Sequence, residues 1–389
     1  MISLRGMAFD HPRGFASMKA TSEKFRLSNP DTVISWDARS LNDFEDYPIE
    51  VLAKKYDLIM MDHPFIGSGV KSGALVPLDK HVPAEYLDDQ ARHSVGPSYQ
   101  SYSWEGHQWA LAVDAAAQVS AYRPDLLEAW GLRPPETWDE VFELAEALPE
   151  GAKIGLALNP THSFCTFITL CANISGNAFL EEATGVDLPI GEEALNFLRR
   201  LVAVIHEASL RADPIQVSEL MSRGDEVAYA PLMFGYSNYA RPGFAPHTLR
   251  FTNIPSFGSE PSGSVLGGVG LTVSAYSQHT QAAIDYALFV AAPECQRGLY
   301  FESGGQPGHR AAWTDPVVNQ RSSSFFEDTL RTLDLAYLRP RHAGYSAFQK
   351  QSGESISDFL WNGGSVREVI KAINRLYKKT KTIGLGPAV

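Results

Sequence analysis

The feature that most constrains the fold is an alternation of short apolar runs and helical segments up to about residue 160. Segments ending at Asp10, Thr32–Asp37 and Tyr56–Met61 have the composition of strands, and the third is almost wholly apolar, as expected when both faces of a sheet are covered. Phe15–Ser28 and Phe44–Lys55 lie between them with helical spacing. Strands separated by about 10 to 15 residues of helix predict βαβ units and a largely parallel sheet.

A second alternating region follows the first. Thr137 and Glu140 have the spacing of a capping box at the start of a helix. Further strands are expected at Ile154–Leu158, Glu226–Phe234 and Val269–Ala275, and further helices at Thr161–Ala172, Glu192–Ala208, Thr280–Ala291 and Pro293–Ser303. The whole pattern predicts an α/β protein.

Composition narrows the function classes. Among 389 residues, 44% are hydrophobic and 20% charged, which excludes a disordered or fibrous chain. The net charge of −12 makes nucleic acid a poor partner. Three cysteines without a CxxC indicate neither a disulfide framework nor a zinc knuckle. No run reaches the ~18 apolar residues of a membrane span, and the N-terminus lacks a signal-peptide pattern. We therefore expect a cytoplasmic protein or a chain that begins after a removed leader.

An Asp-His-Pro triplet follows two of the predicted strands. The first contains His11 and is followed by Arg13, and the second contains Asp62 and His63. In open α/β sheets, ligands bind outside the carboxyl ends of the strands, so these side chains are candidates for one wall of a cleft. Proline after histidine disfavours the α conformation and biases the histidine towards extended backbone.

Two other interpretations of the triplets stay open. Asp or His at a strand end often caps the next helix, which needs no ligand. Asp and His also bind divalent metals, although no third and fourth ligand appears at a diagnostic spacing. We therefore expect no metal and no cofactor.

Asp114 lies inside the apolar run Trp109–Val119, where an ionised carboxylate is costly unless hydrogen bonds satisfy it. A hydroxyl-bearing ligand or backbone donors would meet that need. Trp104 is close in sequence, and aromatic rings beside carboxylates suit sugar recognition. The remaining candidates are polar, aromatic or glycine residues near other strand ends and turns: His162, Tyr236, Tyr239, Gly268 and Arg310.

Catalytic motifs such as GxSxG, the P-loop and HExxH are missing from the sequence. Several blocks instead resemble the family 1 extracellular solute-binding proteins of ABC importers, of the carbohydrate-uptake type. The blocks are Tyr56–Asp62 with Gly73–Asp79, the Thr-Trp-Asp-Glu segment at 137–140, Ser274–Ala283, and Pro293–Pro307. The chain departs from the family at Trp109–Ala112, where the family's proline is missing, and the histidines and Arg13 are not general family features.

The resemblance implies a two-lobe fold of the type II periplasmic-binding-protein kind, each lobe a mostly parallel sheet flanked by helices. The lobes would comprise 1–112 with 266–312 and 113–265 with 313–389, joined by a three-segment hinge. The implied protein is not an enzyme: it is a monomeric receptor, periplasmic or lipid-anchored outside the cell, that closes on its ligand and delivers it to an ABC permease.

The candidate residues add an expectation about the ligand. Arg13 with His11 and His63 is unusually cationic for a neutral sugar, so we expect a sugar, polyol or sugar acid, with Arg13 as the group that would hold a carboxylate. The alternative function is a cytoplasmic metal-dependent enzyme that uses Asp10, His11, Asp62 and His63.

Overall fold

The computed structural model describes residues 1–41 and 47–383 and divides the chain into two compact units. Unit 1 comprises Met1–Ala116, Gly267–Val318 and Pro340–Ser346, and unit 2 comprises Ala117–Leu266, Asn319–Arg339 and Ala347–Val389. The boundaries expected from sequence, at 112, 265 and 312, fall within a few residues of the first three. The return of 340–346 to unit 1 was not expected, and it gives five passages of the chain between units, not three.

A hydrogen-bonding cation explains why 340–346 belongs to unit 1. The Arg341 guanidinium donates to the carbonyl oxygens of Gln100 and Ser103, the latter at 3.0 Å. The backbone of Arg341 also lies so close to Gly67 that a Cβ there would meet it. These contacts join residues about 240 apart in sequence, which no local pattern encodes.

Unit 1 contains a five-stranded sheet in the order β2-β1-β3-β14-β6. Its strands are β1 (Ile2–Phe9), β2 (Thr32–Arg39), β3 (Leu58–Asp62), β6 (Leu111–Ala112) and β14 (Val269–Val273). The predicted parallel pairing is confirmed for β1 with β2 and with β3, but β14 is antiparallel to both its neighbours. The chain re-enters this unit beside the end of β3, where Val269 pairs with Asp62, so β14 must run in the opposite direction.

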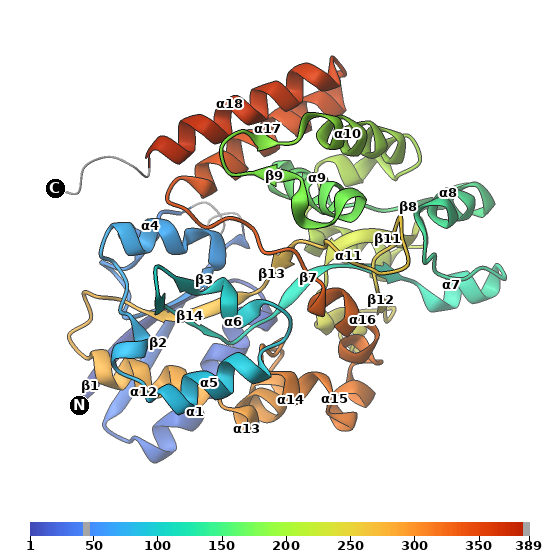
Figure 1. Cartoon of the computed structure of the whole chain (residues 1–389). Helices are drawn as coiled ribbons and strands as arrows, with labels where there is room; N and C mark the ends of the chain where they lie inside the picture. Colours follow the sequence, from blue (N-terminus) through green and yellow to red (C-terminus); the bar gives the residue numbers. More distant parts are fainter. Residues whose placement is uncertain (42–46, 384–389) are drawn as a thin grey trace. The chain divides into compact units, whose positions relative to one another are not determined.

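Helices pack on this sheet. Among them, α1 contacts β2 and α12, and α12 contacts β14 and β6 (Figure 1). The helices of unit 1 are α1 (Ser17–Ser28), α3 (Ile49–Leu52), α4 (Ile66–Lys71), α5 (Ala84–His93), α6 (Ser98–Ser101), α12 (Thr280–Ala291), α13 (Pro293–Cys295) and α14 (Arg310–Trp313). The short hairpin β4 (Ser103–Trp104) with β5 (His107–Gln108) completes the unit.

Unit 2 contains a sheet in the order β12-β7-β11-β8, with β13 also paired to β7. Its strands are β7 (Ala116–Tyr122), β8 (Lys153–Ile154), β11 (Val227–Phe234), β12 (Arg250–Thr252) and β13 (Leu266–Gly267), and a separate pair is β9 (Leu180–Glu181) with β10 (Gly185–Val186). The mostly parallel sheet predicted for this lobe is wrong: β7 is antiparallel to β11 and β12, and only the β11–β8 pair is parallel. Nearly every residue of β7 and β11 is buried, so both faces of these antiparallel strands are covered.

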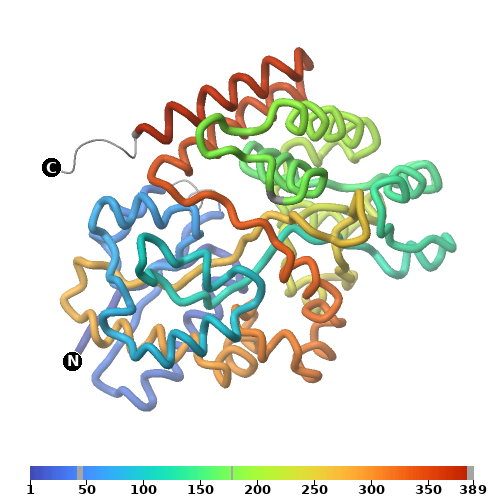
Figure 2. The backbone as a smooth tube through the Cα atoms, viewed as in Figure 1, coloured from blue at the N-terminus to red at the C-terminus, as the bar shows by residue number. Residues whose placement is uncertain are grey.

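The helices of unit 2 are α7 (Pro124–Ala129), α8 (Trp138–Ala147), α9 (Pro160–Ser175), α10 (Leu188–Val202), α11 (Pro214–Arg223), α16 (Phe325–Asp334) and α18 (Val366–Ile383). The helices α15 (Pro316–Arg321) and α17 (Tyr345–Asn362) span points where the chain passes between units, and Figure 2 follows the backbone through them. The Thr137–Glu140 capping box is confirmed at the start of α8.

Three predicted elements differ in length. The strand expected at 154–158 is only Lys153–Ile154, and the helix expected to reach Ala208 ends at Val202. The helix expected at 44–55 begins at Ile49 with Pro48 as its N-cap, because proline lacks the N–H that a helix interior needs, and its residues 44–46 lie outside the described part.

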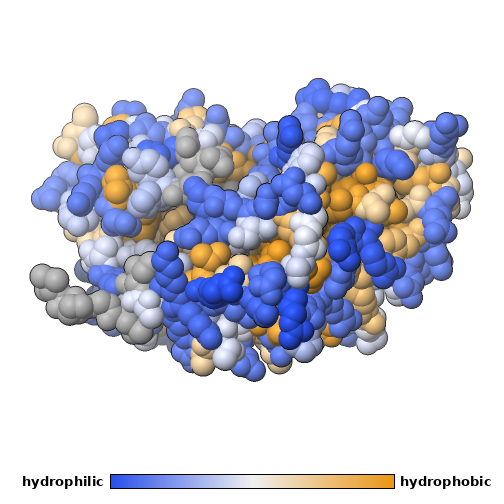
Figure 3. Space-filling view, turned by 90° about the horizontal axis from the view of Figure 1, so that it is seen from above, coloured by the Kyte–Doolittle hydropathy of each residue, from blue (hydrophilic) through white to orange (hydrophobic). Residues whose placement is uncertain are grey.

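The described surface mixes polar and apolar residues. In the face shown in Figure 3, hydrophilic residues cover most of the area, with apolar residues between them. Within residues 1–41 and 47–383, no helix has both the length and the apolar character required to cross a membrane.

Candidate functional site

The carboxyl ends of β1 and β3 lie side by side in unit 1, as the two triplets predicted, because these strands are parallel neighbours. His11 is extended (φ −155°, ψ 150°), as expected before proline. Its Nδ1 accepts a hydrogen bond from the Arg13 backbone N–H at 3.1 Å, so this imidazole caps the π-helical turn Pro12–Ala16. The second triplet is arranged differently, because Asp62 ends β3 and His63 begins a 3₁₀ turn.

A buried ion pair joins two predicted site residues from distant parts of the chain. The Nε of Arg13 donates to Oδ2 of Asp114 at 2.7 Å, and a terminal guanidinium nitrogen donates to Oδ1. Arg13 is 4% exposed and Asp114 is 1% exposed. Burial raises the pKa of Asp114, and the guanidinium beside it opposes that rise. The positive charge of Arg13 and the negative charge of Asp114 therefore neutralise each other within unit 1.

Asp62 and His63 differ in exposure. His63 is fully buried, with its Nδ1 3.2 Å from Oδ1 of Asp62 and its ring edge-on to Tyr102. The Asp62 side chain is 18% exposed, which makes it the part of this triplet that solvent reaches. Asp62 is therefore better placed than His63 to contact a solute.

Gly268 lies against the strand segment that carries Asp114. Its φ is +92°, and a Cβ there would meet the Asp114 carbonyl oxygen and lie 2.8 Å from the Cα of Ala115. The Tyr102 hydroxyl donates to the carbonyl oxygens of Met61, at 3.1 Å, and Gly268, at 3.4 Å. Both the backbone conformation and the close approach therefore require glycine at this position.

Trp104 and Arg310 occupy other parts of unit 1. Trp104 is half-buried in the β4–β5 hairpin, and the Arg341 guanidinium lies over its ring at 5.4 Å from the centroid. That cation occupies one ring face, so a sugar would have to stack on the other. Arg310 is half-buried and opens α14.

The remaining candidates belong to unit 2. His162 on α9 is buried, and its Nδ1 lies 2.8 Å from Oδ1 of Asn159, the N-cap residue of that helix. Burial lowers the pKa of His162 to about 3, with a smaller contribution from the positive charge of Arg339. The ring packs edge-on against Phe234, the last residue of β11. The neutral imidazole is therefore the form this site holds at neutral pH.

Tyr236 and Tyr239 follow β11, and both are buried. The Tyr239 hydroxyl donates to Oε1 of Glu219 at 2.6 Å. Burial raises the pKa of Tyr239, and the nearby Glu219 carboxylate raises it further. This hydroxyl therefore stays protonated and is hydrogen-bonded to a residue of unit 2. His162 and the two tyrosines lie near the same end of β11.

Two supporting residues were not among the predicted candidates. They are Tyr102, whose hydroxyl bonds are given above, and Gln306. The side chain of Gln306 donates to the Ala115 carbonyl at 2.8 Å, and its own carbonyl accepts the Ala115 N–H at 3.1 Å. Their partners lie 41 to 191 residues away, so no local spacing points to these roles.

The metal interpretation of the triplets finds no support in the described residues. Within 1–41 and 47–383, the group of three potential ligands close enough to share an ion is Asp89, His93 and His309. None of Asp10, His11, Asp62 and His63 belongs to it.

Comparison with known proteins places this geometry in a family. The sequence profile of the family described as bacterial extracellular solute-binding protein matches residues 10–297. The maltotriose-binding protein of Pyrococcus abyssi is 24% identical over 325 residues, covering 81% of this chain and 66% of that protein. The mannitol-binding protein of Pseudomonas aeruginosa is 28% identical over 192 residues, covering 46% and 43%. The chain thus matches less than two thirds of the length of either relative.

A solved structure shows the fold. The maltose-bound MalE3 of T. maritima superposes with a TM-score of 0.83 at 19% identity, covering 97% of this chain and 100% of that one. The expected two-lobe fold of solute-binding proteins is confirmed, with mixed sheets.

Proposed function

Because the chain belongs to the bacterial extracellular solute-binding protein family, we propose that it is the solute-binding receptor of an ABC importer for a small polyhydroxylated ligand. The family match over residues 10–297 is the observation that carries the proposal. The names of the relatives, which specify maltotriose and mannitol, support a sugar or a polyol. A binding role, and not catalysis, is what this family membership supports.

We propose that the ligand is uncharged. The expectation of a ligand carboxylate depended on a cationic Arg13, but Asp114 already accepts its bidentate hydrogen bonds. Replacing that partner with a ligand carboxylate would leave Asp114 buried and unpaired, which costs several kcal/mol. Asp62 is the acidic candidate whose carboxyl group is open to solvent, and carboxylate oxygens accept hydrogen bonds from sugar hydroxyls.

The proposed mechanism is closure of the two units on the ligand. A ligand that binds the closed form more tightly shifts an open–closed equilibrium by that difference in affinity. An ABC permease would then select the closed, loaded receptor. This role places the monomer outside the cytoplasmic membrane, in the periplasm or attached by a lipid.

Calorimetry with maltotriose, mannitol and gluconate tests the proposal. We expect one neutral compound to bind with 1:1 stoichiometry, and gluconate not to bind. Asp62→Asn should weaken that binding at least tenfold, about 1.4 kcal/mol, whereas Asp31→Asn, an exposed aspartate before β2, should leave it unchanged. Equal affinities in the wild type and Asp62→Asn would remove Asp62 from the site.

A further inference from the structure

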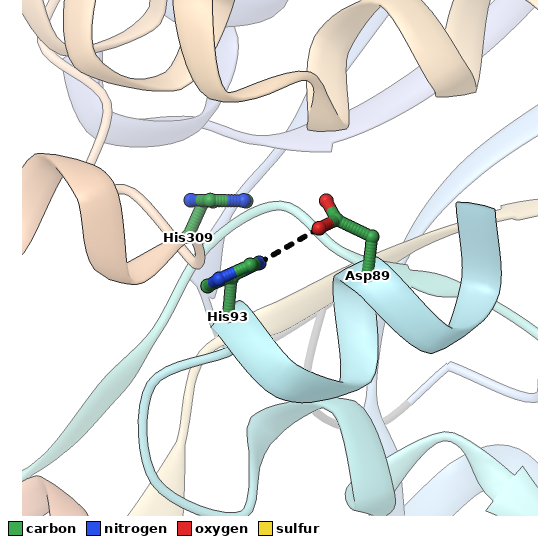
Figure 4. A group of neighbouring side chains, drawn as sticks. All are labelled: Asp89, His93 and His309. Carbon is green, nitrogen blue, oxygen red and sulfur yellow. Dashed lines mark ion pairs between the residues drawn. The ribbon is translucent and has the colours of Figure 1, made fainter. Parts of the chain in front are cut away.

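A cluster of two imidazoles and a carboxylate lies in unit 1 and contains none of the predicted site residues. Asp89 and His93 are four residues apart on α5, so they share a helix face, and Nδ1 of His93 lies 2.9 Å from Oδ1 of Asp89. His309, the N-cap residue of α14, stacks on His93 with ring centroids 5.6 Å apart and planes at 25°. Figure 4 shows the two rings one above the other, with the Asp89 carboxylate beside them.

From this geometry we propose that Asp89, His93 and His309 form a binding site for a divalent zinc ion. One ligand atom from each residue lies within 4.8 Å of the other two. Imidazole nitrogens and a carboxylate oxygen are the donors that zinc takes in sites with three protein ligands and an open fourth position.

The burial and the hydrogen bonding of the His309 ring support an ion bound at this position. The residue is 5% exposed, and its buried Nε2 has no hydrogen-bond partner among residues 1–41 and 47–383. Buried polar nitrogens in folded proteins almost always have a partner, so this atom needs one.

Zinc ligation by Nε2 carries a cost that the structure defines. Nδ1 of His309 accepts the Ala311 N–H at 3.1 Å, so the ring proton lies on Nε2 in the free protein. A metal at Nε2 requires that proton to move to Nδ1, and the cap bond to Ala311 is then lost. The cost is that of one helix-cap hydrogen bond, which is small beside the free energy of zinc coordination in protein sites.

The backbone fixes the distance between the two elements that carry the ligands. Ser94, at the end of α5, pairs with His309 in a β-bridge, and Val95 N–H donates to the Gly308 carbonyl at 3.1 Å. A bound ion would therefore join α5 to the turn before α14.

This turn supports the strand segment of Asp114. The Gly308 N–H donates to the Val113 carbonyl at 3.1 Å, and the Gln306 carbonyl accepts from Ala115 at the same distance. Zinc at the cluster would therefore hold the backbone beside the buried Arg13–Asp114 pair.

Calorimetric titration of the chelator-treated full chain with zinc chloride tests the site. We expect one saturable equivalent in the wild type and at least a tenfold loss of affinity in His93→Ala and in His309→Asn. Asparagine keeps an N-cap acceptor for α14, so His309→Asn removes the imidazole without removing the cap. His107→Ala is the matched control. Nδ1 of His107 lies 2.8 Å from Oδ2 of Asp79 in a comparable pair, but His107 belongs to no group of three neighbouring ligands among the described residues.

Cobalt supplies a second readout that a structural defect would not imitate. Cobalt(II) in the wild type should give the visible absorption of a low-coordinate site, and the two cluster variants should lose it. The proposal is overturned by the absence of a saturable equivalent, by zinc binding that His309→Asn leaves unchanged, or by an equal loss in His107→Ala.

Discussion

Breaking the buried Arg13–Asp114 pair should destabilise unit 1 strongly. Asp114→Leu leaves the guanidinium charge buried without its counter-charge, and Arg13→Met leaves the carboxylate in the same condition. Removing one partner of a buried ion pair costs about 3–5 kcal/mol, whereas replacing both with apolar residues of similar volume is close to neutral. Arg13→Met with Asp114→Leu should therefore lie within about 1 kcal/mol of the wild type, a coupling energy of several kcal/mol.

Hydrogen exchange followed by mass spectrometry is the appropriate assay, since two units need not unfold together and a single global free energy would mix them. The free energy of opening is measured for peptides from β1 and β3. The control cycle uses Arg5 and Asp37, an ion pair at 2.9 Å whose side chains are 55% and 49% exposed, for which about 0–1 kcal/mol of coupling is expected. A coupling at Arg13 and Asp114 no larger than this control would refute the reasoning.

Three further predictions follow from single residues. Because burial lowers the pKa of His162 to about 3, the unfolded chain binds a proton on this residue below about pH 6.5, whereas the folded chain does so only near pH 3. The free energy of unfolding should therefore fall by roughly 2 kcal/mol between pH 8 and pH 5. His162→Gln should reduce this loss in urea titrations monitored on unit 2. Gly268→Ala should destabilise unit 1 by about 1–3 kcal/mol, because its φ is +92° and a Cβ meets Asp114; an unchanged melting temperature would contradict this account. Thr137→Ala should cost about 1 kcal/mol in unit 2 by removing the capping-box oxygen, and Thr137→Ser should restore most of it.

Local sequence signals predicted much of the fold. The capping box at Thr137, the parallel β1–β3 neighbours and the extended His11 all depend on residues within a few positions or on strand order. The mostly parallel sheet that the family resemblance implied for unit 2 was wrong, because strand direction depends on how distant segments pair and leaves no local signal in the sequence. The return of 340–346 depends on the distant contacts of Arg341 and leaves no periodic signal.

The candidate site shows the same division between local and distant information. Arg13 was selected by its place after a strand and Asp114 by its place inside an apolar run, but Arg13 was assigned to a ligand because the two residues are 101 positions apart. The cost of burying Asp114 was recognised, but its partner was not. In the proposed zinc site, Asp89 and His93 are four residues apart on one helix, whereas His309 comes close to them only through the fold.

Native mass spectrometry of the protein incubated with an equimolar mixture of maltotriose, mannitol and gluconate tests the central claim most directly. A receptor for an uncharged polyhydroxylated solute should show a 1:1 adduct with one of the two neutral compounds and none with gluconate. An adduct with gluconate alone, or no adduct at concentrations far above those of a high-affinity receptor, would contradict the account.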